Sequence, residues 1–124
     1  MFVAKRLIDV DRQPAAGGAS GQVSQNDVIR AIPVKAGDTV LNAWIEVYTS
    51  CTGGASCDVG TGDAVDIFQD GQPLDAQACD GAGTTAPTGG GAHYFHVADT
   101  IDVVVKDAAV TAGKFAVCAL IVRL

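Results

Sequence analysis

The chain has 124 residues, of which 48% are hydrophobic and 18% are charged, and its formal net charge is −6. This composition excludes disorder driven by low hydrophobicity and high charge, and the length suits one domain, expected to span residues 1–124. Nucleic-acid binding is excluded too, because phosphate contacts need clustered Lys and Arg, and the only adjacent basic pair is Lys5 and Arg6.

The acidic residues indicate the type of secondary structure. Of the 14 acidic residues only Glu46 is a glutamate, and the chain has 15 glycines. Asp and Gly favour turns, whereas helical surfaces favour Glu and Lys, so we expect strands and turns. No apolar run reaches the roughly 18 residues of a membrane helix, and the N-terminus does not resemble a signal peptide. We therefore expect a protein that starts in the cytoplasm and has no membrane partner.

Short alternating segments, separated by Gly, Asp and Pro, predict an all-β fold. We expect an antiparallel β-sandwich, jelly-roll-like, with about eight strands. The expected strands are 2–10, 27–34, 39–49, 56–59, 65–69, 92–97, 100–106 and 114–124. Glycine-rich connections at 13–25 and 71–91 are interpreted either as partner-contacting segments or as plain surface loops.

The segment 39–49 has one apolar and one mixed face. The face expected to meet the core carries Leu41, Ala43, Ile45 and Val47. The opposite face carries Val40, Asn42, Trp44, Glu46 and Tyr48. Because aromatic side chains are enriched in binding surfaces, Trp44 and Tyr48 are candidate interface anchors. The alternative is that a loop of the same chain covers them.

The segments 100–106 and 114–124 differ in pattern. Ile101, Val103 and Val105 share one face of the first, which predicts a half-buried strand. Both faces of the second are apolar, so this strand is either central in the fold or covered by another subunit. The second alternative makes its last residues, Ile121, Val122 and Leu124, candidate interface residues.

The cysteines leave two alternatives open. Cys51 and Cys57 flank a short Gly-rich loop, so a local disulfide is geometrically reasonable, whereas reduced thiols are expected in a cytosolic product. Cys118 lies inside an apolar segment and is expected to be a small buried residue.

The inventory of catalytic and metal-binding groups is thin. His93 and His96 point to opposite faces of a strand, so we expect them not to share a metal. The acidic stretch 58–66 offers oxygens to Ca²⁺ but lacks the spacing of a calcium loop, and Asp in turns is the simpler interpretation. Neither a nucleophile elbow nor a phosphate-binding loop is present. We therefore expect no enzyme, no cofactor and no metal, which disfavours a hydrolase.

Several strand and turn motifs resemble small structural proteins of tailed bacteriophages. They are Gly37-Asp38-Thr39-Val40-Leu41 within 32–47, Asp58-x-Gly60, the segment 98–105, and Ala112-Gly113-Lys114 before an apolar tail. The resemblance covers 27–124 except the region 71–91, and it carries over no functional residue.

The resemblance implies a capsid decoration (cement) protein with a β-sandwich or jelly-roll fold. Such a protein coats the virion surface, is assembled in the host cytoplasm, binds the major capsid protein, and forms a homotrimer near threefold positions. The alternatives are a host-recognition or carbohydrate-binding module of a virion fibre, and a tail or neck component.

Overall fold

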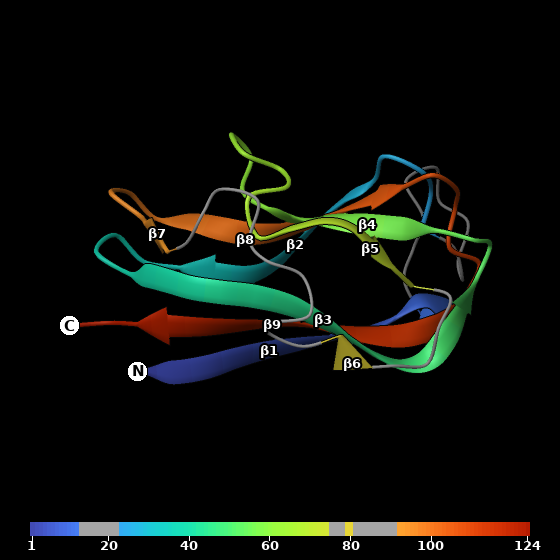
Figure 1. Ribbon diagram of the computed structural model, residues 1–124, viewed down its shortest axis with the longest axis horizontal. Coiled ribbons are helices and arrows are strands. Elements are labelled where there is room, and N and C mark those ends of the chain that lie inside the picture. Colours follow the sequence, from blue (N-terminus) through green and yellow to red (C-terminus); the bar gives the residue numbers. More distant parts are fainter. Residues whose placement is uncertain (13–22, 75–78, 81–91) are drawn as a thin grey trace.

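The computed structural model describes residues 1–12, 23–74, 79–80 and 92–124, which form two facing antiparallel sheets (Figure 1). The first sheet has the order β1-β9-β3, and two short strands, β6 and β7, also pair with β3. The second sheet has the order β2-β8-β4-β5. A 3-10 helix, η1 (Val10–Arg12), follows β1. The strands are β1 (Phe2–Asp9), β2 (Val28–Val34), β3 (Thr39–Thr52), β4 (Ser56–Gly60), β5 (Gln69–Pro73), β6 (Cys79–Asp80), β7 (His93–Tyr94), β8 (Asp99–Lys106) and β9 (Ala112–Val122).

The connections alternate between the two sheets. The chain crosses from one sheet to the other between β1 and β2, β2 and β3, β3 and β4, β5 and β6, and again on both sides of β8. Strands distant in sequence therefore lie side by side, as β1 and β9 do, and the orders of the two sheets are those of a jelly roll. The predicted all-β, jelly-roll-like sandwich is confirmed.

The expected strand 65–69 is wrong, because only Gln69 of that segment lies in a strand, at the start of β5. The preceding residues form a turn in which the Thr61 amide donates to the Ala64 carbonyl (2.9 Å) and the Ala64 amide donates to Thr61 Oγ1 (3.1 Å). Phe68, at the end of this connection, is fully buried. The apolar residue that suggested a strand is therefore a side chain that reaches the core from a loop. The expected strand 92–97 is also shorter than predicted and comprises only β7.

The predicted faces of β3 hold except at its beginning. Ala43, Ile45 and Val47 are buried, as expected. The register with β9 shifts between Val40 and Asn42, which indicates a β-bulge. The bulge shifts the alternation by one residue, so Val40 is fully buried and Leu41 only half-buried, the reverse of the prediction.

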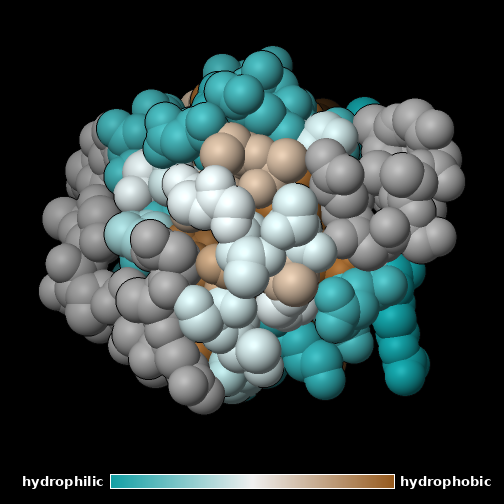
Figure 2. Space-filling model, turned by 90° about the vertical axis from the view of Figure 1, so that its right-hand side faces the viewer, coloured by the Kyte–Doolittle hydropathy of each residue, from teal (hydrophilic) through white to brown (hydrophobic). Residues whose placement is uncertain are grey.

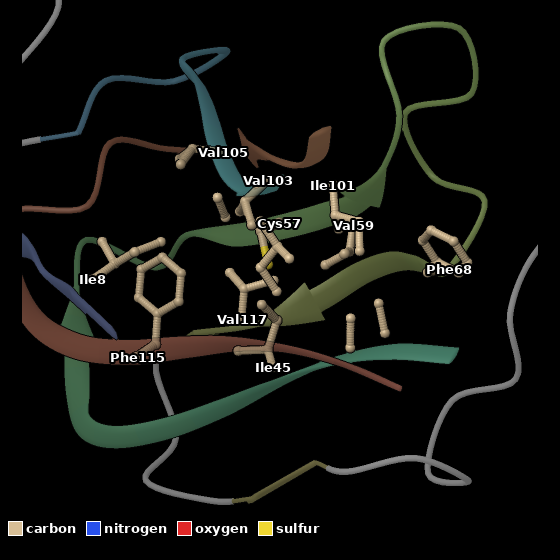
Figure 3. Close-up of a cluster of buried hydrophobic side chains, with 14 of the residues drawn as sticks. Ile8, Ile45, Cys57, Val59, Phe68, Ile101, Val103, Val105, Phe115 and Val117 are labelled. Atoms are coloured by element: carbon tan, nitrogen blue, oxygen red, sulfur yellow. The ribbon is translucent and has the colours of Figure 1, made fainter. Parts of the chain in front are cut away.

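The core lies between the inner faces of the two sheets (Figure 3). Ile45, Phe115 and Val117 from the first sheet point towards Cys57 and Val103 from the second, and all five are fully buried. Complete burial of such an aliphatic or aromatic side chain contributes about 1.5–3 kcal/mol. Ile101 and Val105 of β8 are buried as well, which confirms the predicted inner face of that strand.

Strand β9 is central in the first sheet. It pairs with β1 on one side and β3 on the other, so that Ile121 lies opposite both Phe2 and Val40. Two of the residues that face away from the core, Ala116 and Cys118 in the middle of the strand, are also fully buried. Of the two alternatives for this twice-apolar segment, the structure thus shows the central strand.

Candidate functional site

The outer face of the first sheet carries rows of side chains that cross β1, β9 and β3. Lys5 pairs with Cys118, which in turn pairs with Trp44, and the next row places Ala116 beside Glu46. In these two rows the middle strand contributes short, fully buried side chains, whereas the strands on either side contribute long ones. The long side chains of β1 and β3 consequently form the surface of this face.

A hydrogen-bonded network joins these long side chains, and we call Lys5, Trp44, Glu46 and Tyr48 the Glu46 network. The Lys5 ammonium donates to Glu46 Oε2 (2.7 Å) and to the Tyr48 hydroxyl (2.8 Å). The Tyr48 hydroxyl donates to Glu46 Oε2 (2.5 Å), and Trp44 Nε1 donates to Glu46 Oε1 (3.5 Å). The Lys5 and Tyr48 hydrogen bonds lower the pKa of Glu46 to about 2, and the same contacts raise the pKa of Lys5.

The two predicted aromatic anchors thus lie on one surface with a fixed geometry. The Tyr48 side chain is 42% exposed, while Trp44 is half-buried. Since the polar ends of both are held by Glu46, their rings are oriented before any partner arrives, and such ordering lowers the entropic cost of binding. Their role as anchors stays a prediction.

The C-terminal interface candidates lie in three different environments. Ile121 is fully buried between the sheets, so its side chain cannot contact another subunit, contrary to the prediction. Val122 is half-buried at the end of β9, and Leu124 is exposed. The prediction for Ile121 failed because a strand with two apolar faces does not show which residues pack in the core of the same chain and which are left to contact another subunit.

Sequence reasoning missed an ion pair between Asp38 and Arg123, which we call the Asp38 clamp. Arg123 Nε donates to Asp38 Oδ1 (2.8 Å) and Arg123 Nη2 donates to Asp38 Oδ2 (2.6 Å), a bidentate geometry. Asp38 is only 1% exposed and also accepts the Lys35 amide (2.9 Å), so it closes the β2–β3 turn. The pKa of Asp38 falls to about 2, mainly through Arg123. The guanidinium lies 4.9 Å from the centre of the Phe2 ring.

One open cavity adjoins this clamp, and a second open cavity shares Tyr94 with the first. The first, about 490 Å³, is lined by Lys35, Ala36, Gly37, Asp38, Tyr94, Arg123 and Leu124. The second, about 270 Å³, is lined by Thr61, Asp63, Ala64, His93, Tyr94, Phe95, His96, Val97 and Asp99. Tyr94, which is 50% exposed, lines both the cavity that holds Lys35 and Arg123 and the cavity that holds Asp63 and Asp99.

The two histidines make aromatic contacts. The His93 ring packs edge-on against Phe95, with ring centres 4.7 Å apart, and the His96 ring packs edge-on against Tyr94 at 4.8 Å. Among the residues that the structure describes, no three His, Cys, Asp or Glu side chains are grouped so that they could hold a metal ion.

Two acidic side chains lie on the outer face of the second sheet with little exposure. Asp58 of β4 is 7% exposed and accepts the Gly71 amide (2.9 Å), and Asp102 of β8 is 5% exposed and accepts the Thr100 hydroxyl (2.6 Å). Burial raises the pKa of both carboxyl groups. Asp58, in the stretch considered for Ca²⁺, is therefore a buried acceptor of a turn amide.

Cys51 and Cys57, for which the sequence leaves a disulfide and reduced thiols open, are free thiols in the structure and are buried. Burial raises the pKa of Cys51 to about 11 and that of Cys57 further, which makes both poor nucleophiles in the folded chain. Cys118 is buried, as expected.

Much of the two glycine-rich connections, residues 13–22, 75–78 and 81–91, lies outside the described residues. Their predicted contact with partners therefore stays a prediction. Within the described part of the chain, no helix is long and apolar enough to cross a membrane.

The fold resembles a chain of one solved virus structure. No protein-family model matches the sequence, and no curated protein matches it. A chain of "Acidic stable capsid structure of Helicobacter pylori bacteriophage KHP30" is similar in structure, with a TM-score of 0.54. The likeness covers 99% of this chain and 93% of that chain at 17% sequence identity, and at this identity it shows a shared fold.

Proposed function

We propose that this chain is a structural protein of a bacteriophage virion that binds the outer surface of the head as a decoration protein. The observation that carries the proposal is the fold likeness to a chain of a phage capsid structure, because it extends over nearly the whole of both chains. The motifs in 32–47 and 98–105, which resemble phage structural proteins, support it from the sequence.

The proposed mechanism is adhesion to the major capsid protein, without catalysis. The protein would bridge joints between capsid subunits and add contact area against the outward pressure of packaged DNA. Each contact is weak by itself, but many copies on one particle act together through multivalency. The outer face of the first sheet, with Trp44 and Tyr48 oriented by the Glu46 network, is the surface proposed to meet the capsid.

A second candidate function is carbohydrate binding by a virion fibre. The cavity lined by Tyr94, His96, Asp63 and Asp99 favours it, because an aromatic ring beside carboxylates suits the apolar faces and hydroxyl groups of a sugar. Jelly rolls also occur in lectins as well as in viral capsids. Saturable binding of purified protein to host surface glycans, with no affinity for capsids, would favour this alternative over decoration.

The test uses phage particles from which this gene has been deleted. Purified protein is added back to the particles, and the bound protein is located by electron cryomicroscopy. We expect regular density on the outer surface of the head and heads that withstand more heat before they release DNA. Density on the tail or neck, or no bound protein, would overturn the proposal.

The same assay examines the predicted anchors. Tyr48→Ala should weaken binding to the particles by tenfold or more if Tyr48 is a central anchor, which corresponds to about 1.4 kcal/mol. Val28→Ala is the matched control, because Val28 is also a large exposed apolar residue, at 55%, but lies at the start of β2 in the second sheet. Equal binding by the two variants would show that this face does not meet the capsid.

A further inference from the structure

One end of the sandwich exposes several large apolar side chains. This end carries β7, the β2–β3 turn and both labelled termini (Figure 1). Val97 is 70% exposed, Tyr94 50% and Phe2 38%. The described surface at the opposite end is mixed, with pale side chains near the middle of the hydropathy scale around a few tan, hydrophobic ones (Figure 2). Exposed apolar patches of this kind mark interaction sites on soluble proteins.

Charges of opposite sign flank the aromatic side chain at this end. On one side of Tyr94 the cavity is lined by Lys35 and Arg123, and on the other side it is lined by Asp63 and Asp99. Arg123 is already paired with Asp38. No ion pair joins Lys35 or Asp63 to any residue in the described part of the chain. Each side thus keeps a charge that has no ion-pair partner among the described residues.

We propose that this end binds a second copy of the chain across a two-fold axis near Tyr94. A two-fold axis exchanges the two sides of a surface, so Lys35 of each copy would meet Asp63 of the other. The exposed rings of Tyr94 and the side chains of Val97 would then be buried at the centre. Aromatic and aliphatic side chains surrounded by charged pairs are the usual anatomy of a protein interface.

The charge pattern favours a second copy over an unrelated partner. A chain with a net charge of −6 repels its own copies at long range, so self-association requires local pairs of opposite charge. Lys35 and Asp63, which form no ion pair within the described part of the chain, lie on opposite sides of an apolar centre, so a two-fold contact would form two such pairs. The inference is independent of the proposed role in the virion.

The first experiment measures the molar mass of the purified chain in solution by sedimentation, over a range of concentrations. We expect the mass of two chains for the wild type. Val97→Asp should shift the protein to the mass of one chain, because it buries a charge at the centre of the contact. Val28→Asp is the matched control, since Val28 is also an exposed valine, at 55%, but lies at the start of β2. It should leave the dimer intact.

The second experiment exchanges charges. Lys35→Glu and Asp63→Lys should each weaken the dimer by about tenfold or more, because each places like charges opposite one another. An equimolar mixture of these two variants should form a mixed dimer with an affinity near that of the wild type, since both contacts again join opposite charges. Asp70→Lys, an exposed aspartate of β5, is the control and should not change the affinity. Unchanged thermal unfolding verifies that each variant is folded.

Several outcomes would overturn the inference. These are a wild type that stays monomeric at all concentrations, a trimer such as the phage resemblance implies, or equal effects of Val97→Asp and Val28→Asp. A monomer whose binding to phage heads is lost only in Val97→Asp would show that this end docks on the capsid. That result would refute the dimer and leave the proposed virion function standing.

Discussion

Glu46 shows how one carboxylate organises a surface. It accepts hydrogen bonds from Lys5, Tyr48 and Trp44, and its pKa falls to about 2. Exposed ion pairs contribute little to the free energy of unfolding, because water screens them. The main effect of Glu46 is therefore to orient two aromatic rings on the outer face of the first sheet.

The titration of Glu46 can be followed through Trp44, the only tryptophan of the chain. Because the pKa of Glu46 is lowered in the folded state, the network should persist above pH 4.5 and be lost as the pH falls towards 2. We expect Trp44 fluorescence to change with a midpoint near pH 2. The change should be absent in Glu46→Gln, and a midpoint near pH 4.5 in the wild type would contradict the network.

The buried carboxyl of Asp58 should respond to pH in the opposite direction. Its pKa is raised, so its favourable contribution is fully present below its ordinary pKa and is lost as the pH rises through the raised value. Asp58→Asn keeps an acceptor for the Gly71 amide but removes the charge. We expect it to raise the melting temperature at pH 7 and to raise it less at pH 3. Asp70→Asn, which changes an exposed residue, should have little effect at either pH.

At the scale of elements, alternation in the sequence predicts most strands and their inner faces, because side chains along a strand point to opposite sides with a period of two. The prediction from alternation fails where a bulge or a turn interrupts this two-residue period. The bulge near Val40 exchanges the environments of Val40 and Leu41, and Phe68 fills the core from a turn. Neither feature has a signal in the local sequence pattern.

The candidate sites are less predictable than the strands. Trp44 and Tyr48 are visible as aromatic residues on a mixed face, but the Asp38 clamp joins residues 85 positions apart. Only folding brings such pairs together, so neither composition nor spacing indicates them. The same holds for Lys5 and Glu46, which are separated by 41 positions.

Substitutions at Ile121 and Leu124 distinguish a residue of the core from an exposed residue near the end of β9. Ile121→Ala should lower the free energy of unfolding by about 2–5 kcal/mol, because it leaves a cavity between the sheets. Leu124→Ala, at an exposed position, should change it by less than about 0.5 kcal/mol. Denaturant unfolding of both variants measures the difference. Similar values would mean that Ile121 is not packed as the structure shows.

For the whole molecule, the alternation of the chain between two sheets predicts cooperative unfolding. Neither sheet can form from one continuous stretch, since β1, β3 and β9 make one sheet while β2, β4 and β8 make the other. We expect the transitions followed by Trp44 fluorescence and by far-UV circular dichroism to coincide in denaturant. Separate midpoints would indicate more than one folding unit and would contradict the expected single domain.

The pairing of β1 with β9 also affects how the chain reaches its folded state. Phe2 pairs with Ile121, which lies far later in the sequence, so β1 has no strand beside it until β9 has been synthesised. Such non-local contacts slow folding to the range of milliseconds to seconds. During that interval Phe2, Val3 and Leu7 are open to other nascent chains, and the adjacent charges of Lys5 and Arg6 act as gatekeepers against aggregation.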